Sequence, residues 1–416
     1  MLRADAVLLE KVHASADDEL ARHGVATHRI DKGLTEAELI AALAAVPGTG
    51  PLVVGIRSKT QVTRAVIEAT PRLSAIGAFC IGTDQIDLAC ARACGVAVFN
   101  APFSSTRSVA ELVMAELVAL SRQIVARSNA AHQGKWAKNA QGSREIRGKT
   151  LGIIGYGHIG SQLSVLAEAF GMQVIFHDIV AKLPLGNARQ AASLQDVLSR
   201  SDFVSLHVPD TDFTRGMIGK AELAAMKSDS YLVNASRGRV VELEALRQSL
   251  DAGHLAGAAL DVYPQEPASE SDRFECALQG LDNVILTPHI GGSTLEAQAN
   301  IGLEVAGAVG RYLELGRTVG CVNLPQLDMP PPPSLRGKPA CRLINIHRNV
   351  PGVLSRINRV IAESNVNIAG QALATLEDVG LLFVDMPLGP TDSAADELCR
   401  AVAALDTSVR TRLVSL

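Results

Sequence analysis

Residues 151–178 read LGIIGYGHIGSQLSVLAEAFGMQVIFHD, and this stretch decides the fold of the middle of the chain. An apolar run opens it, three glycines follow in the spacing GxGxxG, and a helical pattern leads to a second apolar run that ends in an aspartate. The glycine spacing alone is a weak signal, but the order of strand, glycine turn, helix, strand and acid is typical of a dinucleotide-binding unit. We therefore predict a dinucleotide site at this turn.

Each glycine of the turn has a physical role in that interpretation. Gly155 permits the tight turn, Gly157 lets the backbone approach a pyrophosphate, and Gly160 lets the helix pack closely on the sheet. The next residues, His158 and Ile159, would present backbone N–H groups to the diphosphate at the helix N-terminus.

The aspartate that closes the unit predicts the cofactor. Asp178 can accept hydrogen bonds from the adenosine ribose hydroxyls, whereas a 2′-phosphate at that place would meet a like charge. We expect NAD rather than NADP.

Composition limits the class of protein without naming a partner. The chain has 416 residues, enough for two or three domains, and a formal net charge of −4, without a basic stretch of the kind that binds nucleic acid. Charges are scattered through the N-terminal residues, unlike a signal peptide, and no apolar run approaches the ~20 residues of a membrane span. No spacing of cysteine, histidine and acid predicts a metal site. We expect a cytoplasmic protein with a small-molecule substrate.

Apolar runs alternate with helical patterns through most of the chain, which predicts two doubly wound parallel-sheet domains. Residues 1–105 and 296–330 lack a glycine loop and are predicted to form a substrate-binding domain. Residues 106–295 are predicted to form the NAD-binding Rossmann domain. The helical pattern from residue 106 to about residue 131 contains no breaker and predicts one long helix between them.

The end of the chain has a different pattern. Residues 331–340 include part of a run of four prolines and are predicted to be a linker. Residues 341–416 alternate in the order βαββαβ and are predicted to form a third, smaller domain.

Four predicted strands of the Rossmann domain are followed by polar residues. These strands cover residues 203–206, 231–233, 256–260 and 284–286. His207 follows the first and Arg237 lies beyond the second, while Asp261 and Glu266 lie beyond the third and His289 beyond the fourth. Because the carboxyl ends of parallel strands meet at one edge of a sheet, we expect these side chains to converge.

The converging group has the chemistry of an alcohol dehydrogenation. Hydride transfer from a secondary alcohol needs a base for the hydroxyl proton, and His289 is the candidate because histidine titrates near neutral pH. Glu266 would hold the ring in one tautomer and raise its pKa, and the planar fork of Arg237 matches a substrate carboxylate. Asp261 is expected to bind the nicotinamide carboxamide. Taken singly, these residues also fit a capping histidine, a surface acid and a solvated cation; their occurrence together favours function.

The motifs GIIGYGHIG, NASRG, ALDVYPQEP and LTPHIGGST resemble those of the D-isomer-specific 2-hydroxyacid dehydrogenases. The resemblance covers nearly the whole chain, and segments such as RSKT and KLPLGNA are similar to the members that act on phosphoglycerate. It implies that Arg237, Glu266 and His289 are the catalytic group. The implied reaction is oxidation of 3-phospho-D-glycerate by NAD to 3-phosphohydroxypyruvate, the first step of L-serine biosynthesis.

The resemblance also implies which residues bind ligands. For NAD they are Gly155, Gly157, His158, Ile159, Gly160, Asp178, Ala235, Ser236, Arg237, Asp261, His289, Ile290, Gly291 and Gly292. For the substrate phosphate, Arg57, Ser58 and Lys138 are the best-placed candidates. The C-terminal domain would be an ACT regulatory domain that binds L-serine through His347, Asn349 and Asn367 at a dimer interface, within a homotetramer.

The sequence departs from this family at one place that bears on regulation. Close relatives carry a Gly-Gly hinge at the place of Lys338, Pro339 and Ala340. This stiffer connection leaves the strength of inhibition by L-serine open. Two other functions stay open: reduction of another 2-oxo acid, such as 2-oxoglutarate or hydroxypyruvate, and an NAD-sensing binding protein or co-repressor.

Overall fold

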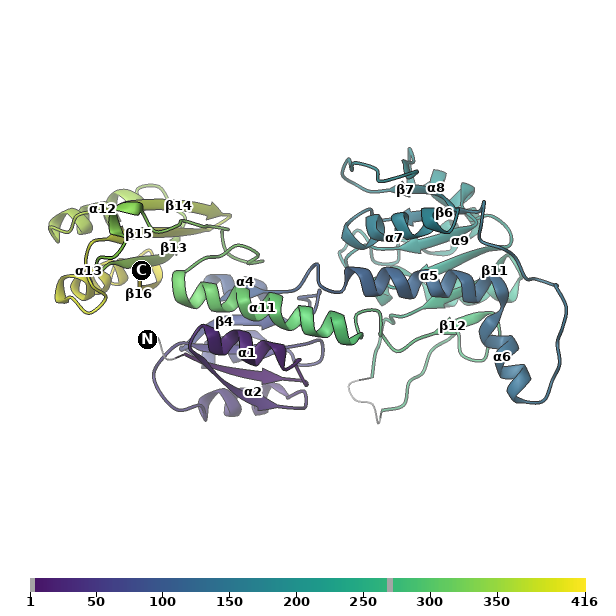
Figure 1. Ribbon diagram of the computed structural model, residues 1–416, viewed down its shortest axis with the longest axis horizontal. Coiled ribbons are helices and arrows are strands. Elements are labelled where there is room, and N and C mark those ends of the chain that lie inside the picture. Colours follow the sequence, from purple (N-terminus) through teal and green to yellow (C-terminus); the bar gives the residue numbers. More distant parts are fainter. Residues whose placement is uncertain (1–3, 268–271) are drawn as a thin grey trace. The chain divides into compact units, whose positions relative to one another are not determined.

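The computed structural model describes residues 4–267 and 272–416 (Figure 1). The chain divides into two compact units, Met1–Ser104 with Gln298–Leu416 and Ser105–Ala297. Each unit is built around a parallel sheet, and a small antiparallel sheet ends the chain. The predicted fold class is confirmed. None of the described helices has the length and apolarity needed to cross a membrane.

The sheet of the first unit has the strand order β2-β1-β3-β4-β5, which is the flavodoxin-like order. Its strands are β1 (Ala4–Leu9), β2 (Val25–Ile30), β3 (Leu52–Ile56), β4 (Leu73–Ala78) and β5 (Ala97–Phe99). Its helices are α1 (Ser15–Arg22), α2 (Glu36–Ala44), α3 (Arg64–Ala69), α4 (Leu88–Ala93) and most of α11 (Leu295–Leu315). Strands β3 and β4 are buried along their full length, as expected where helices cover both faces of a parallel sheet.

The sheet of the second unit has seven parallel strands in the order β12-β11-β10-β9-β6-β7-β8. They are β6 (Thr150–Ile154), β7 (Gln173–His177), β8 (Arg189–Gln190), β9 (Phe203–Leu206), β10 (Ser230–Asn234), β11 (Leu255–Leu260) and β12 (Val284–Leu286). The strand order reverses at β6, because β7 lies on one side of this strand and β9 lies on the other. Dinucleotide folds bind their ligand at such a switch point.

Helices α5 (Thr106–Arg122) and α7 (His158–Ala169) pack side by side (Figure 1). The other helices of this unit are α6 (Ile124–His132), α8 (Leu194–Arg200), α9 (Lys220–Ala225), the 3-10 turn η1 (Gly238–Val240) and α10 (Leu243–Asp251). The apolar side chains of α5, β6 and α7 share one core, which includes Val113, Leu117, Ile153 and Leu163. This packing fixes the helix that follows the glycine turn.

The prediction of one uninterrupted helix over residues 106–131 was wrong. Gln123 adopts a left-handed backbone conformation with φ of 54°, so that α5 ends at Arg122 and α6 begins at Ile124. The backbone N–H of Arg144 donates to the Ser121 carbonyl at 2.7 Å, which replaces a helical hydrogen bond at the break. Glycine or proline would have marked such a break in the sequence, and neither occurs there.

The C-terminal sheet is antiparallel, with the order β14-β15-β13-β16. Its elements are β13 (Cys341–Arg348), α12 (Val353–Glu363), β14 (Gly370–Leu376), β15 (Val379–Met386), α13 (Ser393–Ala403) and β16 (Ser408–Ser415). Leu343 and alternate residues pack on α12 and α13, whereas Ile344 and Ile346 join the core that contains Tyr312 and Leu313 of α11. The proline-rich segment before this sheet contains the 3-10 turn η2 (Pro333–Leu335), in which Leu335 is buried.

Candidate active site

The candidate site lies at the carboxyl ends of β6, β7, β10, β11 and β12, which meet at one edge of the parallel sheet of the second unit. The glycine turn joins β6 to α7, and the candidate catalytic residues follow β10, β11 and β12. One edge of the sheet therefore carries both the expected cofactor turn and the expected catalytic group, with β9 between β6 and β10.

Two of the three turn glycines cannot be replaced without a clash. Gly155 has φ of +91°, and a Cβ on it would lie 2.3 Å from the carbonyl oxygen of His207. A Cβ on Gly160 would lie 2.3 Å from the carbonyl oxygen of Gly155, so the helix can approach the turn only with glycine there. Around Gly157 a Cβ would meet no described atom within 4 Å, which leaves the space that a pyrophosphate requires.

The first turn of α7 and the end of β7 complete the cofactor cradle. Gly157 precedes the helix, and His158 and Ile159 are its first residues, where backbone N–H groups attract anions. Asp178 follows β7 and accepts the backbone N–H of Tyr156 at 2.8 Å and that of Val180 at 3.0 Å. Its carboxylate is thus held against the glycine turn, as a partner for the ribose hydroxyls must be.

The turn after β10 positions Arg237. The buried side chain of Asn234 accepts from the backbone N–H and the hydroxyl of Ser236, at 3.1 and 2.8 Å. Its Nδ2 donates to the carbonyl oxygen of Arg237 at 3.0 Å. Ala235, Ser236 and Arg237 are therefore held by one side chain at the end of the strand.

Asp261 organises the loop that follows β12. Its Oδ1 accepts from the Thr287 hydroxyl at 2.6 Å and from the backbone N–H of Ile290 at 2.8 Å. Its Oδ2 accepts from the backbone N–H of Gly291 at 2.8 Å. These three bonds fix residues 287–291, so Asp261 shapes the loop around His289, a role the sequence did not reveal.

His289 and Glu266 form the pair that was predicted. Nδ1 of His289 lies 2.8 Å from Oε2 of Glu266, while Oε1 of Glu266 accepts the backbone N–H of Tyr263 at 3.2 Å. His289 has a left-handed backbone with φ of 54°. The pair is partly open to solvent, with 45 % of the His289 side chain and 37 % of the Glu266 side chain exposed.

The hydrogen bond changes the acidity of both groups. It raises the pKa of His289 above its usual value, against the opposing effect of burial. Burial by itself would raise the pKa of Glu266, but the hydrogen bond and charge of His289 outweigh it, so that this pKa is lowered. The charge of Arg237 lowers both pKa values, which places its guanidinium within electrostatic range of the pair.

His207 behaves differently from His289. Burial lowers the pKa of its ring to about 4, and its Nε2 lies 2.8 Å from the Ser205 hydroxyl. The ring is therefore neutral in the physiological range, and it is the backbone carbonyl of His207 that lies close to Gly155.

Comparison with known proteins agrees with this geometry. Residues 114–291 match the model of the D-isomer specific 2-hydroxyacid dehydrogenase NAD binding domain, and residues 343–408 match an AHAS small subunit-like ACT domain. D-3-phosphoglycerate dehydrogenase from Dictyostelium discoideum is 46% identical over 98% of this chain and 96% of its own length. The protein of that name from Escherichia coli K12 is 48% identical over 98% of this chain and 97% of its own.

The chain belongs to the D-isomer specific 2-hydroxyacid dehydrogenase family. As a member of this family it is an NAD-dependent oxidoreductase. Among solved structures it is similar to a glyoxylate reductase from Paecilomyes thermophila, with a TM-score of 0.68 and 29% identity over 77% of this chain and 98% of that one. A D-lactate dehydrogenase from Aquifex aeolicus in complex with NAD and lactic acid gives a TM-score of 0.63 and 26% identity over 74% of this chain and 95% of that one.

The candidate substrate residues of this dehydrogenase lie in different units. Arg57 and Ser58 follow β3 of the first unit, where Ser58 is exposed and Arg57 is half-buried. Lys138 belongs to the second unit and lines a hollow of about 470 Å³ with Arg122 and Arg127. We call the group of Arg237, Glu266 and His289 the strand-end site, and none of these residues lines that hollow.

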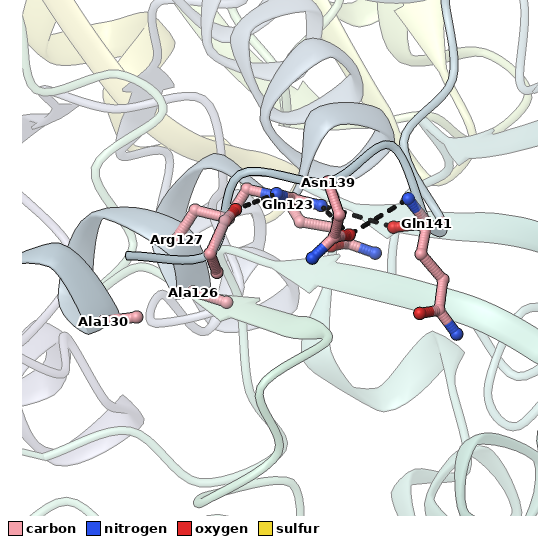
Figure 2. Close-up of a pocket in the computed structure, with 8 residues that line it drawn as sticks. Gln123, Ala126, Arg127, Ala130, Asn139 and Gln141 are labelled. Carbon is pink, nitrogen blue, oxygen red and sulfur yellow. Dashed lines mark hydrogen bonds between the residues drawn. The ribbon is translucent and has the colours of Figure 1, made fainter. Parts of the chain in front are cut away.

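A neighbouring hollow of similar size is lined by α6 and the segment after it, and Figure 2 shows the hydrogen bonds between residues that line it. The guanidinium of Arg127 donates to the carbonyl oxygens of Ala137 at 2.8 Å and Gln141 at 3.3 Å. These bonds tie α6 to the segment that follows it, so the hollow is part of the scaffold of this segment rather than of the strand-end site.

The candidate effector residues lie in the C-terminal sheet and its loops. His347 is buried in β13, its Nδ1 lies 2.9 Å from Asn345 Oδ1, and its Nε2 has no hydrogen-bond partner among the described residues. Burial lowers its pKa, which keeps the ring neutral. Asn349 is exposed and donates to the Glu377 carbonyl at 3.1 Å, and Asn367 is exposed in the loop before β14.

Several residues that shape the site were missed at the level of sequence. Asn234 and Thr287 act through hydrogen bonds to Ser236 and Asp261, which only the fold brings together. Glu116 of α5 is 3 % exposed, and neither carboxyl oxygen has a hydrogen-bond partner among the described residues. An acid inside a strongly apolar helical pattern was the signal that could have marked it.

Proposed function

We propose that this dehydrogenase oxidises 3-phospho-D-glycerate to 3-phosphohydroxypyruvate with NAD, the first step of L-serine biosynthesis. The observation that carries the proposal is the His289–Glu266 pair, 2.8 Å apart, at the same edge of the sheet as a glycine turn of dinucleotide-binding geometry. Relatives that match the chain almost end to end carry the name of an enzyme that acts on this substrate.

The residues present fit NAD, because Gly155 and Gly160 have no room for a side chain and Gly157 faces open space. When bound, NAD supplies the acceptor of the hydride that leaves C2 of the substrate. The chain itself handles the proton. Nδ1 of His289 is engaged with Glu266, so Nε2 is the atom that takes the hydroxyl proton as the C2–O bond becomes a carbonyl.

Arg237 and the loop after β3 have separate roles in this proposal. The guanidinium of Arg237, held after β10 by Asn234, binds the carboxylate and polarises the oxygen at C2. Arg57 and Ser58 bind the phosphate, with Lys138 as a further candidate cation. Glu266 stabilises the imidazolium that forms when His289 is protonated.

The test is a panel of substrates assayed for NAD reduction. It contains 3-phospho-D-glycerate, D-glycerate, D-lactate and D-2-hydroxyglutarate. We expect kcat/KM for the phosphorylated acid to exceed that for D-glycerate by at least tenfold. Equal values, or a preference for 2-oxoglutarate or hydroxypyruvate in the reverse direction, would assign the chain to the reduction of another 2-oxo acid. NADH binding without turnover of any acid would favour an NAD-sensing protein.

We also propose that the ACT domain binds L-serine and that binding inhibits the enzyme. The support is the buried Nε2 of His347, which is an acceptor without a partner among the described residues because Asn345 Oδ1 accepts from Nδ1–H. An ammonium or hydroxyl group supplies the missing donor. We expect Asn349→Ala to raise the serine concentration needed for half-maximal inhibition, measured together with calorimetric binding. No detectable binding at millimolar serine would reject the site, and binding without inhibition would show that the two sites are uncoupled.

The homotetramer implied by the family resemblance stays a prediction. Sedimentation or light scattering of the full chain would determine the assembly, and its dependence on serine would report whether the ACT domains meet at an interface.

A further inference from the structure

A buried carboxylate outside the strand-end site holds the loop that carries Arg57 and Ser58. Glu10, which follows β1, is 7 % exposed. Its Oε1 accepts the backbone N–H of Thr60 at 2.7 Å and its Oε2 accepts that of Lys59 at 3.1 Å. Both oxygens thus bind the backbone of the loop after β3, 49 and 50 residues further along the chain.

The backbone of Glu10 is in a conformation that favours glycine. Its φ is 59° and that of Lys11 is 53°, so two consecutive non-glycine residues are left-handed. The backbone N–H of Glu10 donates to the Ile30 carbonyl at 3.1 Å, which holds this turn against β2. Glycine would adopt the same turn with less strain, but it would offer no carboxylate to the loop after β3.

Two further contacts fix the same loop. The buried Gln85 donates from Nε2 to the Arg57 carbonyl at 2.6 Å and to the Gly82 carbonyl at 3.3 Å. On the other side, the backbone N–H of Leu34 donates to the Thr60 hydroxyl at 3.2 Å. The side chains of Ser58 and Lys59 remain exposed and that of Arg57 is half-buried, so the loop is fixed by its backbone while its polar side chains face outward.

We propose that Glu10 is a positioning residue for the phosphate end of the substrate, a role that rests on the proposed function. By drawing the N–H groups of Lys59 and Thr60 inward, Glu10 fixes the direction in which the Arg57, Ser58 and Lys59 side chains project. Recognition of a phosphate requires several donors to converge on one group, and such convergence is lost when the loop that carries them can move. Glu10 therefore sets the selectivity for phosphorylated over plain hydroxy acids without touching substrate.

The decisive variant is Glu10→Gly. Glycine suits the left-handed backbone, so the variant should fold, but it provides no acceptor for Lys59 and Thr60. We expect KM for 3-phospho-D-glycerate to rise roughly tenfold, the effect of losing one or two modest hydrogen bonds, with kcat changed less than about twofold. NADH affinity and kcat/KM for D-glycerate should stay unchanged, because neither depends on the phosphate loop.

Lys11→Gly is the matched control. Lys11 shares the left-handed conformation and is exposed, so the substitution makes the same backbone change without removing a contact to the loop. It should leave the preference for the phosphorylated acid unchanged. Glu10→Gln, which keeps one acceptor oxygen, should give an intermediate KM and serves as the test should Glu10→Gly fail to fold.

The outcomes separate this inference from the proposed function. If the wild type does not prefer 3-phospho-D-glycerate over D-glycerate, the proposed function fails. The positioning role is overturned if the wild type shows the preference and Glu10→Gly keeps it. It is also overturned if Glu10→Gln lowers KM, because that result would mean that charge repulsion from the carboxylate dominates. An equal loss of kcat/KM for both acids would also overturn it, since a general structural role predicts that result.

Discussion

At the scale of the residue, two glutamates of the second unit respond to burial in opposite ways. Glu266 shares a hydrogen bond with His289 and accepts a backbone N–H, so its pKa is lowered although it is partly buried. Glu116 has no such partner among the described residues, and burial together with the charge of Asp261 raises its pKa to about 8. Partners, rather than burial alone, decide which acid is charged at neutral pH.

The first expectation concerns the pH dependence of the reaction. His289 must be neutral to accept a proton, so oxidation is lost as the pH falls through its raised pKa. Glu266→Gln removes the negative charge that raises this pKa, so the acidic limb of kcat/KM should move to lower pH. Reduction needs the protonated ring, and its basic limb should move in the same direction. Unmoved limbs in both profiles would show that Glu266 does not act on His289.

The second expectation concerns stability and Glu116. Its pKa is raised from 4.5 to about 8, so the folded state holds a proton that the unfolded state releases between these values. Stability must therefore fall as pH rises through this window, by up to roughly 1.4 kcal/mol per pH unit. Glu116→Gln removes this titration, so its stability relative to wild type should increase steadily with pH up to about 8. Urea unfolding at several pH values is the measurement; a constant difference would show that Glu116 is already ionised in the folded protein.

At the scale of the element, one strand–turn–helix–strand motif is held together by its own contacts. It consists of β6, the glycine turn, α7 and β7. Gly155 and Gly160 are confined by backbone atoms, and Asp178 closes the motif by accepting the N–H of Tyr156. Tyr156 in turn stacks on Phe176 of β7 with ring centroids 3.8 Å apart. The carboxylate that we propose as the selector of the cofactor is therefore also part of the turn.

This double role leads to an expectation for cofactor choice. The wild type should use NAD in preference to NADP, and Asp178→Ala should reduce the preference, because the repulsion of a 2′-phosphate is removed. Asp178→Asn also removes the charge but keeps an oxygen acceptor for the Tyr156 N–H. Both variants should lose selectivity, while Asp178→Ala should lose more thermal stability. Efficient use of NADP by the wild type would contradict the role given to Asp178.

At the scale of the whole molecule, the C-terminal sheet packs against the rest of the first unit, to which it belongs. Arg342 and Asp385 are fully buried and joined by two hydrogen bonds of 2.6 and 2.8 Å. Arg342 also donates to the Leu315 carbonyl at the end of α11 and to the Met329 carbonyl in the segment that leads to the sheet. The C-terminal sheet and the parallel sheet of the first unit therefore share one hydrophobic core, and Arg342 of the buried ion pair also bonds to the segment between them.

The ion pair gives an expectation for the stability of the first unit. Asp385→Ala leaves a buried guanidinium without its counter-charge and should cost about 3–5 kcal/mol in the free energy of unfolding. The double variant Arg342→Met/Asp385→Leu removes both charges and should cost clearly less. Denaturant unfolding of the full chain checks both values. Equal losses in the single and double variants would mean that the backbone contacts of Arg342, rather than the pair, hold the sheet in place.

Much of this protein was predictable from its sequence because the signals are local. The glycine turn, the alternating strands and helices and the βαββαβ tail depend on spacing within a few residues, and the boundaries of β9 and β12 match those predicted. His289 and Glu266 were predicted as a pair because strand ends of a parallel sheet converge, and the structure places them 2.8 Å apart.

Only the tertiary structure decided the features that depend on distant partners. These features join residues that are far apart in the chain. They are the helix break at Gln123, the hydrogen bonds through which Asp261 and Glu10 hold loops, and the docking of the C-terminal sheet through Arg342. The sequence determined where strands, turns and candidate catalytic groups lie, because local propensity and apolar periodicity are carried by neighbouring residues. Which buried polar groups find partners depends on the packed fold, because an acceptor can be satisfied by a backbone N–H from any part of the chain.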